Sequence, residues 1–133
     1  MILWMLDTNA VTAAVHQRSP HLDAALLRHG TQTIRVSAIT YGEIRYGIEM
    51  KPQASRLARN IDDFFREVPI LPWGEKTSEV YGRLRASLRQ AGRALSPLDM
   101  LIAAHALEAG ATLVSSDRAF RSVPGLSVED WTA

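Results

Sequence analysis

Residues 2–9, ILWMLDTN, join a short apolar run to an acid and two polar side chains. A continuous apolar run of this length followed by polar residues predicts a strand at 2–6. Asp7 then lies just past the carboxyl end of that strand. In open parallel sheets ligands bind outside this edge, so an acid is expected where a site would form.

The rest of the chain alternates short strand-like runs with helical stretches. Further strands are predicted at 33–36, 68–71, 112–114 and 126–128. Helices are predicted at 10–15, 20–27, 38–50, 54–67, 75–91 and 97–109, with a helical turn at 118–121. We therefore expect an α/β fold in a single domain, 1–133, with a central and mostly parallel sheet of about five short strands flanked by helices. Pro69 places the strand at 68–71 near a sheet edge, because proline cannot donate to the ladder.

Composition limits the function classes. With 133 residues and 47% hydrophobic content, the chain can form one compact core. It has no cysteine, which excludes disulfides, thiolate zinc sites and cysteine nucleophiles. No apolar run approaches the roughly 20 residues of a membrane span, and Asp7 interrupts the N-terminal run before it reaches signal-peptide length. We expect a cytoplasmic protein with no membrane association.

Four acids fall at or near the ends of predicted elements: Asp7, Glu43, Asp99 and Asp117. Asp7 and Asp117 both follow strands, and Asp99 begins a helix that is otherwise nearly all apolar. Carboxylates bind hard divalent cations, which can activate water against a phosphodiester. If the fold brings these acids together, the sequence predicts a metal-dependent nuclease.

Each acid also has a purely structural explanation. Asp7 and Asp117 could cap the helical segments that follow them, which is worth about 1 kcal/mol each. Asp99 stands three residues after Ser96, as in a capping box, and Glu43 could be a solvated helix residue. The placement of all four at one rim favours a shared site. Gly42 and Gly47, beside Glu43, cost about 1 kcal/mol each inside a helix, so we expect a close approach to that face.

Thirteen of the fifteen basic residues are arginine, although the net charge is only +1. The guanidinium fork suits phosphate oxygens, but codon usage in a GC-rich genome explains the same bias. Arg85, Arg89 and Arg93 recur at four-residue spacing, which aligns them on one helix face that either binds phosphates or is simply solvated. Candidates near the acidic motifs are Arg18, Arg45 and Arg118.

Three segments carry a family resemblance: LDTN at 6–9, YGEIRYG at 41–47 and SPLDMLIA at 96–103. Together with the ending that holds Leu126, Glu129, Asp130 and Trp131, they resemble PIN-domain proteins, and more narrowly the VapC-type toxins of bacterial toxin–antitoxin systems. The order and spacing of the motifs are specific, and the resemblance covers nearly the whole chain.

The resemblance implies a small α/β domain with endoribonuclease activity that depends on Mg²⁺ or Mn²⁺. The family's acidic residues carry over onto Asp7, Glu43, Asp99 and Asp117. The resemblance makes all four acids the expected metal-binding residues. Many relatives have asparagine or an added polar residue near the fourth position, so Asp117 either binds the metal directly or assists the other acids. Thr8, Asn9 and Ser115 are the expected partners that hold the acids in place.

The same resemblance implies partners. The substrate would be a structured RNA, with tRNA and in particular initiator tRNA as the expected class. A homodimer and a VapB-type antitoxin are also implied. Such antitoxins thread a C-terminal segment over the active site, sometimes with an arginine among the carboxylates.

Other classes fit less well. A haloacid-dehalogenase phosphatase needs an aspartate two residues after the first, where this chain has Asn9. A receiver domain needs a lysine after a late strand, whereas Lys51 and Lys76 lie elsewhere. A non-catalytic PIN-like module that binds RNA or protein stays open as the alternative. It would be expected to have lost carboxylates, and all four are present.

Overall fold

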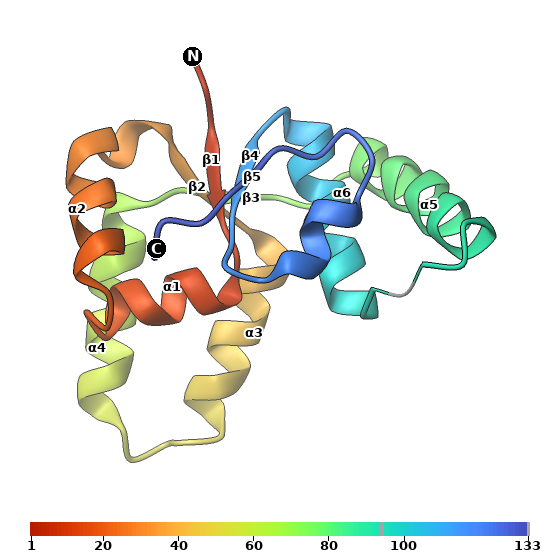
Figure 1. Ribbon diagram of the computed structural model, residues 1–133. Coiled ribbons are helices and arrows are strands. Elements are labelled where there is room, and N and C mark those ends of the chain that lie inside the picture. Colours follow the sequence, from red (N-terminus) through yellow and green to blue (C-terminus); the bar gives the residue numbers. More distant parts are fainter. Residues whose placement is uncertain (94, 133) are drawn as a thin grey trace.

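The computed structural model describes residues 1–93 and 95–132. Its sheet is parallel throughout and has the order β3-β2-β1-β4-β5 (Figure 1). The described strands are β1 (Trp4–Leu6), β2 (Ile34–Ser37), β3 (Ile70–Leu71), β4 (Thr112–Val114) and β5 (Val128–Glu129). The predicted α/β class and the edge position of the third strand are confirmed.

The helices are α1 (Thr8–Val15), α2 (Pro20–His29), α3 (Ala38–Glu49), α4 (Ser55–Glu67), α5 (Glu75–Gln90) and α6 (Pro97–Ala109), with short 3-10 turns η1 (Thr31–Thr33) and η2 (Arg118–Ser122). In the described part of the chain, none of them has the length and apolar character to cross a membrane.

Strand β1 shows how the sheet separates two apolar layers. Its side chains alternate between faces, so Trp4 and Leu6 pack with α1 to α4 while Met5 packs with α5 and α6. All three β1 residues are buried, as expected for a central parallel strand covered on both faces. This arrangement fixes the carboxyl end of β1, and therefore Asp7, between the two helical layers.

The element boundaries differ from expectation in small ways with physical causes. The first strand starts at Trp4 rather than at residue 2, and Ile2 is 57% exposed. Helix α1 starts at Thr8 rather than at residue 10, because Asp7 caps it. The last strand, Val128–Glu129, starts two residues later and ends one residue later than the predicted strand at 126–128.

The prediction of a close approach at Gly42 and Gly47 is wrong. A Cβ atom at either position would meet no atom within 4 Å. Gly47 instead lines an open groove between α1, α3 and α4, so the missing side chain leaves space rather than permitting contact.

Candidate active site

Asp7 is the buried acid of the sheet edge, with 5% of its surface exposed. Its backbone N–H donates to the Val114 carbonyl at 3.1 Å, which extends the pairing of β1 with β4 by one residue. Its Oδ1 accepts from the Ala10 N–H at 2.8 Å and so caps α1. The backbone therefore holds this carboxylate firmly at the carboxyl end of the two central strands.

Burial raises the pKa of the Asp7 carboxyl above its usual value, and the negative charges of Asp99 and Asp117 raise it further. Hydrogen bonds from the Ser115 hydroxyl and the Ala10 amide partly offset this effect on the pKa. Charges influence one another this way only at short range. Asp99 and Asp117 therefore lie near enough for their charges to act on Asp7, although the three acids come from separate segments.

Asp99 lies in the first turn of α6. The helix starts at Pro97, and the Ser96 hydroxyl accepts from the Asp99 N–H at 3.1 Å. Within the described residues, the reverse bond from the Ser96 N–H to the Asp99 carboxylate is not formed, so only half of a capping box exists. Burial, followed by the charge of Asp117, raises the pKa of the Asp99 carboxyl, and the Ser96 hydroxyl lowers it in part.

Asp117 follows β4 and caps the turn η2, since its Oδ1 accepts from the Ala119 N–H at 2.9 Å. Ser115 is buried and links this acid to the first one. Its Oγ accepts from the Asp117 N–H at 3.0 Å, and its hydroxyl lowers the pKa of the Asp7 carboxyl. One serine at the end of β4 thus acts on two of the acids.

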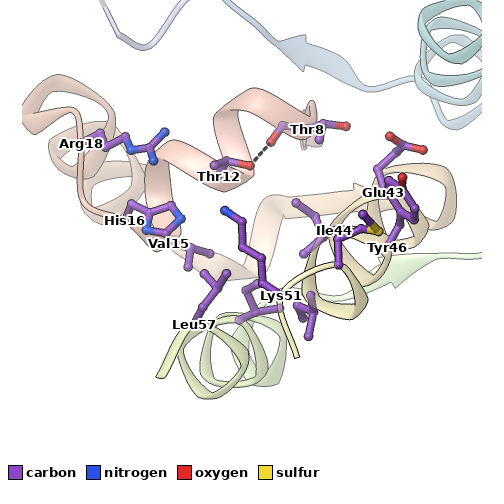
Figure 2. A pocket seen from close by; sticks show the side chains of 14 residues that line it. Thr8, Thr12, Val15, His16, Arg18, Glu43, Ile44, Tyr46, Lys51 and Leu57 are labelled. Atoms are coloured by element: carbon purple, nitrogen blue, oxygen red, sulfur yellow. Dashed lines mark hydrogen bonds between the residues drawn. The ribbon is translucent and has the colours of Figure 1, made fainter. Parts of the chain in front are cut away.

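Glu43 is separate from this trio. It lies in the second turn of α3 and lines the groove, whose volume is about 330 Å³, together with Thr8 (Figure 2). Because Thr8 directly follows Asp7, Glu43 faces the same rim of the sheet from the opposite helix.

The side chains at this edge of the sheet that could bind a metal are carboxylates. In the described part of the chain, no three acidic or histidine side chains stand close enough to form a ready metal-binding group. The donor set still suits a hard divalent cation, because the donors are carboxylates and the buried one is destabilised by the charges of its neighbours. A cation is the ligand that would relieve that repulsion.

The other candidate residues lie around this edge. Thr8 and Asn9 begin α1, but among the described residues neither side chain bonds to Asp7. Asn9 lines a polar pocket with Ser115 and Ser116. Arg18 borders both this pocket and the Glu43 groove.

Two further arginines differ in how they are engaged. Arg45 pairs with Asp62 at 3.3 Å and lies 5.9 Å above the Tyr41 ring. Arg118 is exposed and directly follows Asp117.

Sequence reasoning missed a buried pair that fixes α6. The Ser37 Oγ lies 2.6 Å from the His105 Nδ1, and both residues are almost fully buried. The Ser37 Oγ also accepts from the Ile39 N–H at 3.1 Å, so this serine caps α3 as well as contacting the ring. Burial lowers the pKa of His105, which keeps the ring neutral in this role. The pair joins the end of β2 to the helix that carries Asp99, and 68 residues of separation left no local signal for it.

The fold with its acidic edge is of the PIN class, since a model of the PIN domain matches residues 4–126. The ribonuclease VapC2 of Rickettsia felis is 32% identical over 133 residues, covering 98% of each chain. The tRNA(fMet)-specific endonuclease VapC of Salmonella typhimurium is 29% identical over 132 residues, covering 98% of this chain and 99% of its own. The crystal structure of VapBC2 from Rickettsia felis bound to a promoter DNA fragment matches with a TM-score of 0.92 and 30% identity, over 98% of this chain and 99% of that one. The chain therefore belongs to the VapC proteins of the PIN-domain family.

Proposed function

We propose that this protein is an endoribonuclease toxin that depends on Mg²⁺ or Mn²⁺ and cleaves structured RNA, with tRNA as the substrate class, in the cytoplasm. The observation that carries the proposal is the buried Asp7 carboxylate, destabilised by Asp99 and Asp117 at the sheet edge. Relatives named as a ribonuclease and as a tRNA(fMet)-specific endonuclease support the reaction class. A homodimer is part of the same proposal.

The proposed role of each acid follows from its position. Asp7 and Asp99 would hold the cation, with Asp117 supporting them through Ser115. The cation, when bound, supplies positive charge that activates water and stabilises the phosphate. Glu43, on the opposite helix, would accept a proton from the attacking water. The water oxygen bonds to phosphorus and the ribose 3′-oxygen leaves, so the products carry a 5′-phosphate and a 3′-hydroxyl.

The reaction is tested by cleavage and by the chemistry of the ends. Purified protein is expected to cut RNA with Mg²⁺ or Mn²⁺ and to stop at background level with EDTA. End-mapping should find 5′-phosphates. Cyclic phosphates would contradict the mechanism, because they form when the RNA 2′-hydroxyl attacks. No cleavage of any RNA with either metal would contradict the proposed function and favour the non-catalytic alternative.

The groove between α1, α3 and α4 supports a VapB-type antitoxin as partner. Its floor is apolar, with Ile44, Ile48, Leu57 and Ile61, and it carries the basic side chains of His16, Arg18 and Lys51 (Figure 2). Tyr46 and Met50, which also line it, are 63% and 66% exposed. An extended or helical segment lying there would cover these side chains and pass beside Glu43. The related solved structures are VapBC complexes, consistent with such a segment.

Growth assays test the toxin and its partner. Expression of the protein alone is expected to stop growth, and co-expression of the small neighbouring gene product should relieve the arrest by direct binding. Asp7→Ala should not arrest growth at matched protein level. If it does, catalysis is not the cause.

A variant that fills the groove tests antitoxin binding separately from catalysis. A side chain at Gly47 has open space around its Cβ and leucine favours the helix, so Gly47→Leu should fold and still arrest growth. Relief by the neighbour should be lost because the groove is occupied. Relief equal to that of the wild type would place the antitoxin elsewhere.

A further inference from the structure

Helices α5 and α6 lie on the other side of the sheet from α1 to α4 (Figure 1). A second groove lies between the end of α5 and the start of α6. Its volume is about 280 Å³. Three arginines line it: Arg85 and Arg89 of α5, and Arg93, which lies past the end of that helix at Gln90 and so not on the single helix face that its spacing predicts. The other lining residues are apolar or glycine: Leu88, Gly92, Leu95 and Met100. None of the described residues that line it is acidic. The four-residue spacing seen in the sequence therefore converges on one cavity rather than on a dispersed surface.

Two of the arginines are held in place by neutral partners. Arg85 donates to the Tyr81 hydroxyl at 2.7 Å and lies 6.0 Å above its ring. Arg93 donates to the Ser122 carbonyl at 2.6 Å. Within the described residues, the ion pairs are Arg45–Asp62 and Arg66–Asp63, so no carboxylate neutralises the groove. Its positive charge is available to an anion, and two of its guanidinium groups are already positioned.

The groove adjoins the acidic edge at two points. Met100, in its wall, directly follows Asp99. Ser122, which Arg93 contacts, ends the turn that Asp117 caps. These two links join the groove to the segments that carry Asp99 and Asp117.

We propose that Arg85, Arg89 and Arg93 bind the phosphates of the RNA strand that flank the cleaved bond, an inference that rests on the proposed function. The carboxylates repel a polyanion, and the net charge of +1 supplies little general attraction. A local arginine groove beside the acids offsets this repulsion. Guanidinium groups suit phosphate oxygens because they donate in pairs. Contacts of this kind position the strand and are insensitive to base sequence.

The experiment measures binding separately from cleavage. Fluorescein-labelled tRNA is titrated with Asp7→Asn protein in Mg²⁺ by anisotropy, at several salt concentrations, with and without Arg89→Gln. The matched control is Arg83→Gln, an exposed arginine of the same helix that does not line the groove. Both changes remove one positive charge from α5, and both side chains are exposed, so folding should be preserved.

Arg89→Gln is expected to weaken binding by about fivefold at moderate salt and to reduce the slope of log affinity against log salt by about 1. Arg83→Gln should change affinity by less than about twofold. Equal effects of the two changes would contradict the proposal that the groove binds the RNA phosphates. Tighter binding of a DNA duplex than of tRNA, with the same dependence on Arg89, would overturn RNA as its ligand. These outcomes do not depend on turnover, so they are distinguishable from a failure of the wild-type protein to cleave.

Discussion

Asp99→Asn is expected to reduce RNA cleavage by at least about a hundredfold, because even the outer partners of metal ligands are worth roughly 10- to 100-fold. The free energy of unfolding should change by no more than about 1 kcal/mol. The helix cap survives the substitution, since the Ser96 hydroxyl accepts from the backbone N–H of residue 99, which asparagine keeps. What is lost is the negative charge. Single-turnover cleavage and urea unfolding measure the two quantities.

Asp23→Asn is the matched control. Asp23 also lies near the start of a helix, α2, with a serine cap and a proline at its first position, but it is not among the acids whose charges raise the pKa of Asp7. It should lose neither activity nor much stability. If Asp99→Asn retains near wild-type cleavage, Asp99 has only the structural role that its position after Ser96 suggests.

The sheet edge was predictable because its cause is local. An apolar run ends at residue 6 and an acid follows. Because parallel strands place their carboxyl ends at one edge of the sheet, where ligands bind, Asp7 is expected at that edge. The same reasoning applies to Asp117 after β4. Edge placement of β3 followed from Pro69, which lacks the N–H that an inner strand would need.

Features that depend on contact between distant segments were not predictable. The Ser37–His105 pair and the packing of His29 on Trp131, with ring centres 4.6 Å apart, join residues that no periodicity connects. Gly47 gave the wrong signal for a related reason. The cost of glycine in a helix is visible in sequence, but whether the missing side chain admits a neighbour or leaves a groove depends on which helices face it.

The carboxylates illustrate the same limit. The sequence predicts all four at one rim, but in the structure only the charges of Asp99 and Asp117 act on the pKa of Asp7, whereas Glu43 lines the groove beside Thr8. The packing of α3 determines where Glu43 lies, and a sequence motif does not encode that packing. The role of Glu43 as proton acceptor therefore stays a prediction, as do the metal-binding roles of the other three.

Asp7→Asn is expected to abolish cleavage and yet raise the melting temperature of the metal-free protein. Burial and the charges of Asp99 and Asp117 raise the pKa of Asp7, so its ionised form destabilises the fold at neutral pH. Asparagine removes that charge and still caps α1, because Asn and Asp are equally good caps. Both changes have the direction expected where function is maintained at the expense of stability.

The pH dependence has a definite sign. A carboxyl whose folded pKa is raised stabilises the fold below its unfolded pKa, near 3.8, and loses this contribution as the pH rises through the folded pKa. The advantage of Asp7→Asn over wild type should therefore be absent at low pH, grow through this window and stay constant above it. An advantage independent of pH would assign the stabilisation to something other than the charge of Asp7.

Mg²⁺ should stabilise the wild type much more than Asp7→Asn. Saturating Mg²⁺ at about a hundred times Kd stabilises the wild type by about 2.7 kcal/mol, or a rise of about 10 °C in a chain of this length. Asp7→Asn lacks a ligand, so its rise should be much smaller although its melting temperature starts higher. If the acids were independent caps, the substitution would leave any effect of Mg²⁺ unchanged. Thermal melts of both proteins in EDTA and in Mg²⁺ therefore decide whether Asp7 belongs to a shared metal pocket, because only a shared pocket reverses the order of stability between the two conditions.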